Sequence, residues 1–212
     1  MTGAVGGWAE GIGWFVLGAF GWTLFEYVLH RWAFHEMRGK HLGSREHLEH
    51  HVRAQWSFDP VILLAWAGVV LAGWGWGSLG TKAAGPVGWA LGAGWIVGYF
   101  FYEYHHAQSH LRGPRNRWER WVRINHFHHH FGHPLSNQGV TVGWWDVVFR
   151  TQERPERVRV PRRLAMPWLL DEQGEVRPEY RDDYELVGAR DVSDRQVAID
   201  RARAFANLVP HE

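Results

Sequence analysis

Long uncharged stretches alternate with short polar ones through the first half of the chain. Residues 11–25 carry no charge, and the apolar run continues to Leu29. Two more uncharged stretches, 60–81 and 83–102, are separated only by Lys82. Because about 20 helical residues cross the hydrocarbon core of a bilayer, this pattern predicts three membrane-spanning helices, the last two joined as a tight hairpin. Glycine pairs with GxxxG spacing, which let such helices approach closely, occur at Gly7/Gly11, Gly88/Gly92 and Gly94/Gly98.

Histidines recur at helical spacing beside these stretches. The spacing HxxHH occurs twice, in HLEHH and in NHFHHHFGH, and it places three rings on one face of a helix. Two pairs accompany it, in HRWAFH and HAQSH; the first shares a face only if its helix ends or bulges, because five residues turn an α-helix by roughly 140°. These four boxes contain His30, His35, His47, His50, His51, His106, His110, His126, His129 and His130.

Ten histidines at these spacings predict a metal centre. Neutral imidazole is the commonest protein ligand for transition metals, and ten rings are too many for one ion and suit two. The sequence therefore predicts a dinuclear, all-histidine site. His41 and His133 are candidates for supporting or spare ligands, whereas His105 and His128 lie off the ligand faces and His211 belongs to a solvated tail.

The basic residues predict how the helices are oriented, because short cytoplasmic loops are enriched in Lys and Arg. Five basic residues follow the first span and five follow the third, whereas the hairpin holds only Lys82. Three crossings with the N-terminus outside then place all four histidine boxes on the cytoplasmic face. The predicted fold class is all-α: an integral membrane helical bundle of about three spans with a cytoplasmic helical cap that carries the dinuclear site.

Composition excludes several kinds of site and partner. The chain has 212 residues, a formal net charge of +1 and no cysteine. The absence of cysteine excludes cysteine-ligated iron–sulfur clusters, thiolate-ligated haem, covalently attached c-type haem and disulfides. With no basic stripe and almost no net charge, we expect no nucleic-acid partner. The first 13 residues lack Lys and Arg, so the basic region of a cleaved signal peptide is missing.

The chain changes character after Thr151. We expect a membrane domain over 1–151 and a cytoplasmic strap with an amphipathic helix over 152–212, where acidic and basic residues are nearly balanced. The motif PWLL at 167–170 is expected to fold over the site as part of a lid. Ser193 opens a capping box, which predicts a helix to about Val209 with Ile199, Ala202 and Phe205 on its packed side.

Three acidic residues in apolar surroundings are candidates for support of the metal ligands. Glu26 precedes His30 by four residues and Glu103 precedes His106 by three, so each carboxylate is expected to bind the second ring nitrogen of its neighbour and fix its tautomer. Asp146, in the sequence WWD, is the third candidate. The alternatives are a hydrogen bond to a neighbouring helix or a place at the membrane interface.

From His30 to about Thr151 the chain resembles the fatty acid hydroxylase and sterol desaturase superfamily of integral-membrane di-iron enzymes. The resemblance rests on HRWAFH, HLEHH, YFFYEYHHAQSH, NHFHHHFGH and WWDVVFRT, and the last three are most similar to fatty acid 2-hydroxylases. It implies that the ten histidines bind two iron ions, although zinc could replace iron on purification. It also implies O2 as oxidant, a lipid substrate, and external electrons from a separate ferredoxin, cytochrome or reductase.

We therefore expect a lipid hydroxylase or desaturase that oxidises a C–H bond of a fatty-acyl, sterol or other membrane lipid, in a bacterial inner membrane. The chain lacks the cytochrome b5 domain that is fused to eukaryotic 2-hydroxylases, and it has fewer predicted spans. Three alternatives stay open. They are a carotenoid hydroxylase with the same mechanism, a zinc-dependent membrane hydrolase and a metal transporter.

Overall fold

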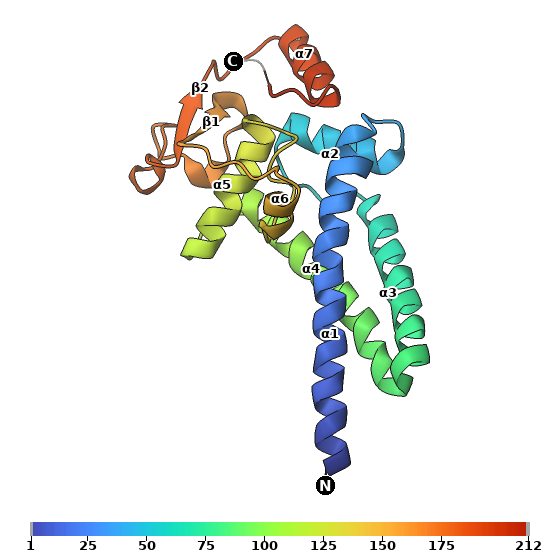
Figure 1. The fold of residues 1–212 in the computed structure, drawn as a ribbon. Coiled ribbons are helices and arrows are strands. Elements are labelled where there is room, and N and C mark those ends of the chain that lie inside the picture. Colours follow the sequence, from blue (N-terminus) through green and yellow to red (C-terminus); the bar gives the residue numbers. More distant parts are fainter. Residues whose placement is uncertain (1, 211–212) are drawn as a thin grey trace. The chain divides into compact units, whose positions relative to one another are not determined.

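The computed structural model describes residues 2–210, with side chains from Gly7 onward, so His211 lies outside the described residues. The chain is predominantly helical (Figure 1). The α-helices and strands are α1 (Thr2–Val28), α2 (Leu42–Arg53), α3 (Ile62–Ala84), α4 (Trp89–Leu111), α5 (Arg117–Phe131), α6 (Trp144–Val148), β1 (Val158–Pro161), β2 (Tyr184–Val187) and α7 (Asp194–Phe205). A π-helical segment, η1 (Leu29–Glu36), continues α1, and short 3₁₀ segments are η2 (Gly85–Gly88), η3 (Arg162–Leu164), η4 (Pro167–Leu169) and η5 (Pro178–Tyr180).

The chain forms two compact units, each made of segments distant in sequence. One contains the residues up to Glu26 together with 57–104, and the other contains 27–56 together with 105–212. All ten histidines of the four boxes belong to the second unit. These two units differ from the two domains that the change in composition predicts, 1–151 and 152–212. That domain division stays a prediction.

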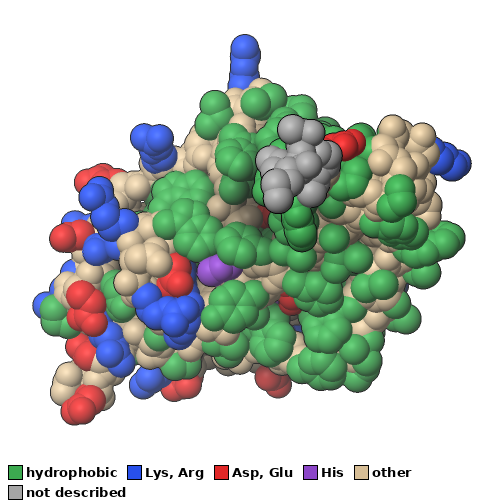
Figure 2. Space-filling model, turned by 90° about the horizontal axis from the view of Figure 1, so that it is seen from below, with side chains coloured by type: hydrophobic (Ala, Val, Ile, Leu, Met, Phe, Trp, Pro, Cys, Tyr) green, Lys and Arg blue, Asp and Glu red, His purple; other side chains and the backbone are tan. Residues whose placement is uncertain are grey.

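The first unit is built from long apolar helices. Two helical segments, Gly7–Glu36 and Ile62–Leu111, are long and apolar enough to cross a membrane, and the second contains the hairpin of α3, η2 and α4. Only 22% and 11% of the residues in their most apolar windows are buried. Core helices of soluble proteins bury most of their apolar side chains, so these helices suit a lipid environment. Figure 2 shows hydrophobic side chains gathered over much of one face of the protein.

Glycines set the spacing of these helices, as the GxxxG pairs predict for α4. A Cβ atom at Gly92 would lie 2.0 Å from the carbonyl oxygen of Gly73 in α3, and one at Gly94 would lie 2.0 Å from that of Phe15 in α1. Because glycine has no Cβ, the helix backbones come into direct contact at these positions. Gly7, by contrast, has no neighbour within 4 Å of that position.

The second unit contains a short parallel sheet, so the expectation of an all-α protein is wrong there. Val158 of β1 pairs with Tyr184 of β2, and the register continues to Pro161 and Val187. The alternation in VRVP explains this strand, because successive side chains in a strand point to opposite faces. Val158 and Val160 are buried in the core of the unit, whereas Arg159 between them is exposed.

The C-terminal region also differs from its predicted form. Trp168 and Leu169 of the PWLL motif lie in the hydrophobic core with Phe127, and the Trp168 indole donates to the Ser109 carbonyl oxygen (3.0 Å). The motif is therefore part of the core and does not form a lid. Burying the two apolar side chains stabilises the unit more than an exposed flap would.

Ser193 is the N-cap of α7, as predicted, because its side chain accepts a hydrogen bond from the Gln196 backbone N–H, whereas the Gln196 side chain donates to Asp200. The helix that it begins is shorter than predicted and ends at Phe205. The predicted packed side is also wrong, since Ile199 is exposed and Asp200 is buried. Asp200 can be buried because it forms an ion pair with Arg163.

Replacing Gly92 by alanine should lower the thermal stability of the protein in detergent. The added methyl group would meet the Gly73 carbonyl, and separating the helices should cost about 1–3 kcal/mol. The matched control is Gly75→Ala in α3, where nothing lies within 4 Å of the new Cβ and better helix propensity should leave stability equal or higher. Thermal unfolding followed by size-exclusion chromatography measures both; equal melting temperatures for the two variants would contradict this packing.

Candidate metal centre

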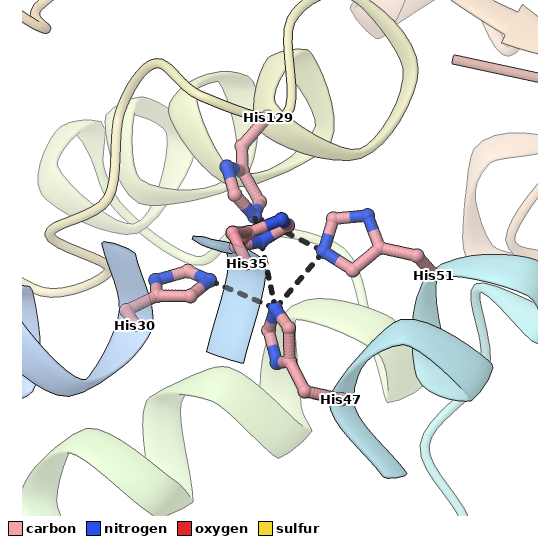
Figure 3. Close-up of side chains that lie close together, drawn as sticks. All are labelled: His30, His35, His47, His51 and His129. Carbon is pink, nitrogen blue, oxygen red and sulfur yellow. Dashed lines mark hydrogen bonds between the residues drawn. The ribbon is translucent and has the colours of Figure 1, made fainter. Parts of the chain in front are cut away.

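The structure brings the ten histidines together in two groups of five. In each group, one nitrogen from every ring lies within 4.8 Å of the others. The first histidine group is His30, His35, His47, His51 and His129 (Figure 3). The second histidine group is His50, His106, His110, His126 and His130.

Each HxxHH motif supplies both groups, which the sequence did not predict. In α2, His47 and His51 face the first group and His50 faces the second. In α5 the roles are reversed, because His129 alone enters the first group. Around a helix axis, the side chains of two residues four apart in sequence point only about 40° away from each other. The remaining histidine of the motif points about 60–100° away from them. Each motif therefore divides its rings between the two groups instead of directing all three to one group.

The pair in HRWAFH shares a group because its helix is locally widened. His30 and His35 lie on η1, a π-helix with hydrogen bonds between residues five apart. Their ring centroids are 5.2 Å apart. The expected bulge is therefore present, and it brings together two rings that a regular α-helix would turn apart.

Hydrogen bonds on the outer ring nitrogens fix the tautomers in the first histidine group. His30 Nδ1 lies 2.6 Å from the Gln138 carbonyl oxygen, and His129 Nδ1 lies 2.9 Å from that of Ser136. A carbonyl oxygen only accepts hydrogen bonds, so each Nδ1 carries the hydrogen and donates it. The Nε2 atoms of both rings therefore present lone pairs to the centre of the group.

His35 is held in the same way by the C-terminal segment. Its Nδ1 lies 3.0 Å from Oδ1 of Asn207, whose Nδ2 in turn donates to the His35 carbonyl oxygen at 3.2 Å. His35 Nε2 then faces His129 Nε2 at 3.1 Å, and both atoms carry lone pairs. Two acceptors at this distance repel each other unless a cation lies between them.

These distances fit a bound transition-metal ion. The five Nε2 contacts of the first group measure 2.9–3.2 Å. Metal–nitrogen bonds of ~2.1 Å place neighbouring ligands at right angles about 3.0 Å apart. The residues present therefore fit a metal ion, and the neutral nitrogen donors suit iron, zinc or copper better than calcium or magnesium.

The second histidine group has similar features. His110 Nδ1 donates to the Ala54 carbonyl oxygen at 2.9 Å and His50 Nδ1 to that of Gln55 at 3.2 Å. Ala54 ends α2 in the left-handed conformation (φ 50°), which turns its carbonyl toward α4. Both ring nitrogens of the buried His130 lack a hydrogen-bond partner. A buried polar atom without a partner is costly, and a metal bond would satisfy the ring nitrogen that carries the lone pair.

Burial keeps these rings neutral. Removal from water lowers the pKa of His126, His129 and His130 well below the usual value, and lowers that of His50 to about 4. Neutral imidazole is the form that binds metals. The site is therefore ready for metal ions at neutral pH without first losing protons.

The comparison with protein families decides the identification. Residues 15–151 match the family model described as fatty acid hydroxylase. This protein belongs to the fatty acid hydroxylase family.

Several curated relatives of this protein are named 2-hydroxylases. It is 32% identical over 142 residues to dihydroceramide fatty acyl 2-hydroxylase FAH1 of Arabidopsis thaliana, covering 64% of this chain and 59% of the relative. It is 27% identical over 146 residues to human fatty acid 2-hydroxylase, covering 66% of this chain and 39% of the relative. The chain thus spans 59% or less of the length of these relatives. A solved structure titled full-length scs7p, with only the hydroxylase domain visible, has a TM-score of 0.49 and 26% identity over 69% of this chain and 57% of that one.

Asp146 supports the ligands of this family member indirectly. Its carboxylate accepts hydrogen bonds from the backbone N–H groups of Gln138 (2.7 Å) and Gly139 (2.8 Å) and from the Thr151 hydroxyl (2.7 Å). Burial raises the pKa of Asp146. Asp146 thus holds the loop whose Gln138 carbonyl orients His30. The sequence instead predicts a direct contact between this carboxylate and a histidine ring.

Glu26 and Glu103 belong to the compact unit that does not contain the ten histidines, and their predicted support of His30 and His106 stays a prediction. The His30 Nδ1 hydrogen is already accepted by the Gln138 carbonyl. His41, a candidate spare ligand, instead caps α2 by accepting from the Ser44 N–H.

His133 and His128 lie outside both histidine groups. His133 Nδ1 and His128 Nε2 contact the two carboxylate oxygens of Glu153 at 2.6 and 2.9 Å. These contacts orient the end of α5 and its following turn. His128 therefore offers a control position within the same motif as three of the predicted ligands.

Arg123 fixes the helices that carry most of the second histidine group. Its buried guanidinium donates to the carbonyl oxygens of Gln108 and Arg112 in and just after α4 (2.9 Å each) and of Glu119 in α5 (3.0 Å). The last carbonyls of a helix have no partner within the helix. Arg123 donates to one of these carbonyls, that of Gln108, and to that of Arg112 just beyond the helix, and so links the end of α4 to α5.

The groups that orient the rings have almost no signature in the sequence. Gln138 and Ser136 act through backbone carbonyls, which any residue type carries, and Asn207 is 172 residues from its partner His35. Only Asp146 was singled out, as an acidic residue in an apolar segment.

Replacing Asn207 by alanine should weaken metal binding in the first histidine group. The His35 ring would lose the acceptor that fixes its tautomer, and loss of such a partner typically lowers metal affinity ~10–100-fold. The second group should keep its affinity. Competition with a chelator measures both ions, and Leu208→Ala, at a neighbouring exposed position, is the control. Unchanged affinity of both ions in Asn207→Ala would show that Asn207 does not support a ligand.

Proposed function

We propose that this protein is an O2-dependent lipid hydroxylase that holds one iron ion in each histidine group. The observation that carries the proposal is the convergence of five neutral imidazole nitrogens in each group. The family membership supports hydroxylation of a lipid, and the relatives are named for fatty acids and dihydroceramide fatty acyl chains. We infer that the substrate is a fatty acyl chain, oxidised at the carbon next to its carbonyl group.

A pair of redox-active iron ions, when bound, supplies the O2 chemistry needed to oxidise an unactivated C–H bond. The residues of this chain prepare the site for that chemistry. The carbonyls of Gln138 and Ser136 and the amide of Asn207 keep each inner nitrogen deprotonated. Most of the ring side chains are buried, which limits the access of water and of competing reactions.

The given residues contain no cysteine to bind an iron–sulfur cluster, so the proposal includes an electron donor other than these residues. We propose a ferredoxin, cytochrome or reductase as the donor. We further propose three spans with the N-terminus outside, which would place the histidine groups on the cytoplasmic face of a bacterial inner membrane. The basic residues on both sides of the histidine boxes support this orientation.

The protein, loaded with iron and supplied with a reductase, should convert fatty acyl lipids to 2-hydroxy products whose new oxygen comes from O2. His129→Ala should abolish this activity, because His129 belongs to the first group. His128→Ala should retain most of it, because His128 contacts Glu153 instead. Mass spectrometry with isotopically labelled O2 measures the product.

Two outcomes would contradict the proposed function. Hydrolysis of the lipid by the zinc-loaded protein without O2 would identify a zinc-dependent hydrolase. Hydroxylation of carotenoids but not of acyl lipids would support O2-dependent hydroxylation but show that the proposed fatty acyl substrate is wrong.

A further inference from the structure

The short helix α6 has one buried polar side and one exposed apolar side. Asp146 is 1% exposed and faces the loop that holds His30. Val147 and Val148 are 64% and 62% exposed, Trp144 is 47% exposed and Phe149, directly after the helix, is 38% exposed. Adjacent exposed side chains of this size are unusual on a water-facing surface.

This apolar surface is continuous with one of the membrane-compatible helices. The Phe149 ring stacks on Tyr27 with centroids 4.8 Å apart and an angle of 17° between the planes. Phe149 also lies 6.1 Å from the ring of Trp32, which is 44% exposed. Tyr27 and Trp32 both belong to the apolar helical segment Gly7–Glu36. If that segment crosses a bilayer, its aromatic end and α6 reach the same depth.

The side chains at the edge of this surface suit lipid headgroups. Trp and Tyr are enriched at the membrane–water boundary, where an apolar ring and a polar edge are both satisfied. The guanidinium of Arg31 lies 5.7 Å from the Trp32 ring centroid and donates to the Tyr27 hydroxyl at 2.8 Å. Arg150 follows Phe149 directly and is exposed. Arginines at such an edge attract lipid phosphates.

We propose that Trp32, Trp144, Val147, Val148 and Phe149 form a docking surface for the lipid bilayer, in addition to the helices that cross it. The apolar side chains enter the boundary between headgroups and acyl chains, and Arg31 and Arg150 bind the headgroups. The inference rests on the membrane insertion in the proposed function and not on its iron or oxygen chemistry.

The docking surface is connected to the first histidine group through α6. Asp146, on the opposite side of the helix from Val148, accepts a hydrogen bond from the Gln138 N–H, and the Gln138 carbonyl accepts one from His30. Only one residue of the loop therefore separates the membrane-bound helix from a predicted metal ligand. Contact with lipid would steady the loop that orients His30.

Site-specific labelling tests the proposal directly, because the chain contains no cysteine. An environment-sensitive fluorophore is attached to the new cysteine of Val147→Cys, on α6. The control is the same label on Val197→Cys, on α7, where Val197 is 46% exposed. The full chain is placed in lipid nanodiscs. Quenching is measured with a lipid-attached nitroxide and with aqueous iodide, and a single peak in size-exclusion chromatography together with the helical circular-dichroism spectrum of the unlabelled protein confirms that each labelled variant is folded.

The label at position 147 should emit at shorter wavelength and be quenched several-fold more by the nitroxide than by iodide, with the reverse at position 197. Equal iodide quenching at both positions would overturn the proposal. Protection of position 147 from both quenchers would also overturn it, because a protein surface would then cover α6. Neither result depends on hydroxylase activity, so the two proposals can fail separately.

Discussion

The structure of the histidine site depends on one type of interaction, the hydrogen bond from an outer ring nitrogen to a fixed acceptor. A buried imidazole with hydrogen on Nδ1 can only present a lone pair at Nε2. The acceptors of His30, His35 and His129 enforce this state at 2.6–3.0 Å. The lone pairs of these three rings then point into one small volume, where they repel one another unless a cation lies between them. If this group binds a metal ion, binding and folding of the unit are coupled.

This requirement explains why the second unit is assembled from distant parts of the sequence. The loop around Gln138 supplies two acceptors and is held by Asp146 on α6. The C-terminal segment supplies Asn207, and the left-handed end of α2 supplies the Ala54 carbonyl. Ala54 shares one hydrophobic core with Trp168, with the small sheet and with Phe127 of α5, and this core fixes the end of α2 next to α5. The described residues beyond the family match thus contribute Asn207 as an acceptor, and no histidine among them belongs to either group.

The sequence predicts which histidines converge better than how they divide into two groups. Histidine spacing identified all ten rings that converge, since side-chain periodicity is a local property of a helix. The 2+1 division of each HxxHH motif was missed because it depends on where neighbouring helices lie. The π-helical turn at His30 was expected only as a condition for pairing with His35. The strand at Val158, where a connecting strap is expected, and the role of Asn207 both depend on partners far away in the sequence, Tyr184 and His35.

The most direct test of the two-ion site is the metal content per chain of purified protein, measured for the native sequence, His129→Ala, His126→Ala and His128→Ala. We expect about two ions in the native protein and in His128→Ala. We expect about one in His129→Ala, where the second group remains, and about one in His126→Ala, where the first group remains. A single ion in the native protein, or metal content that neither His129→Ala nor His126→Ala reduces, would contradict the two-ion site.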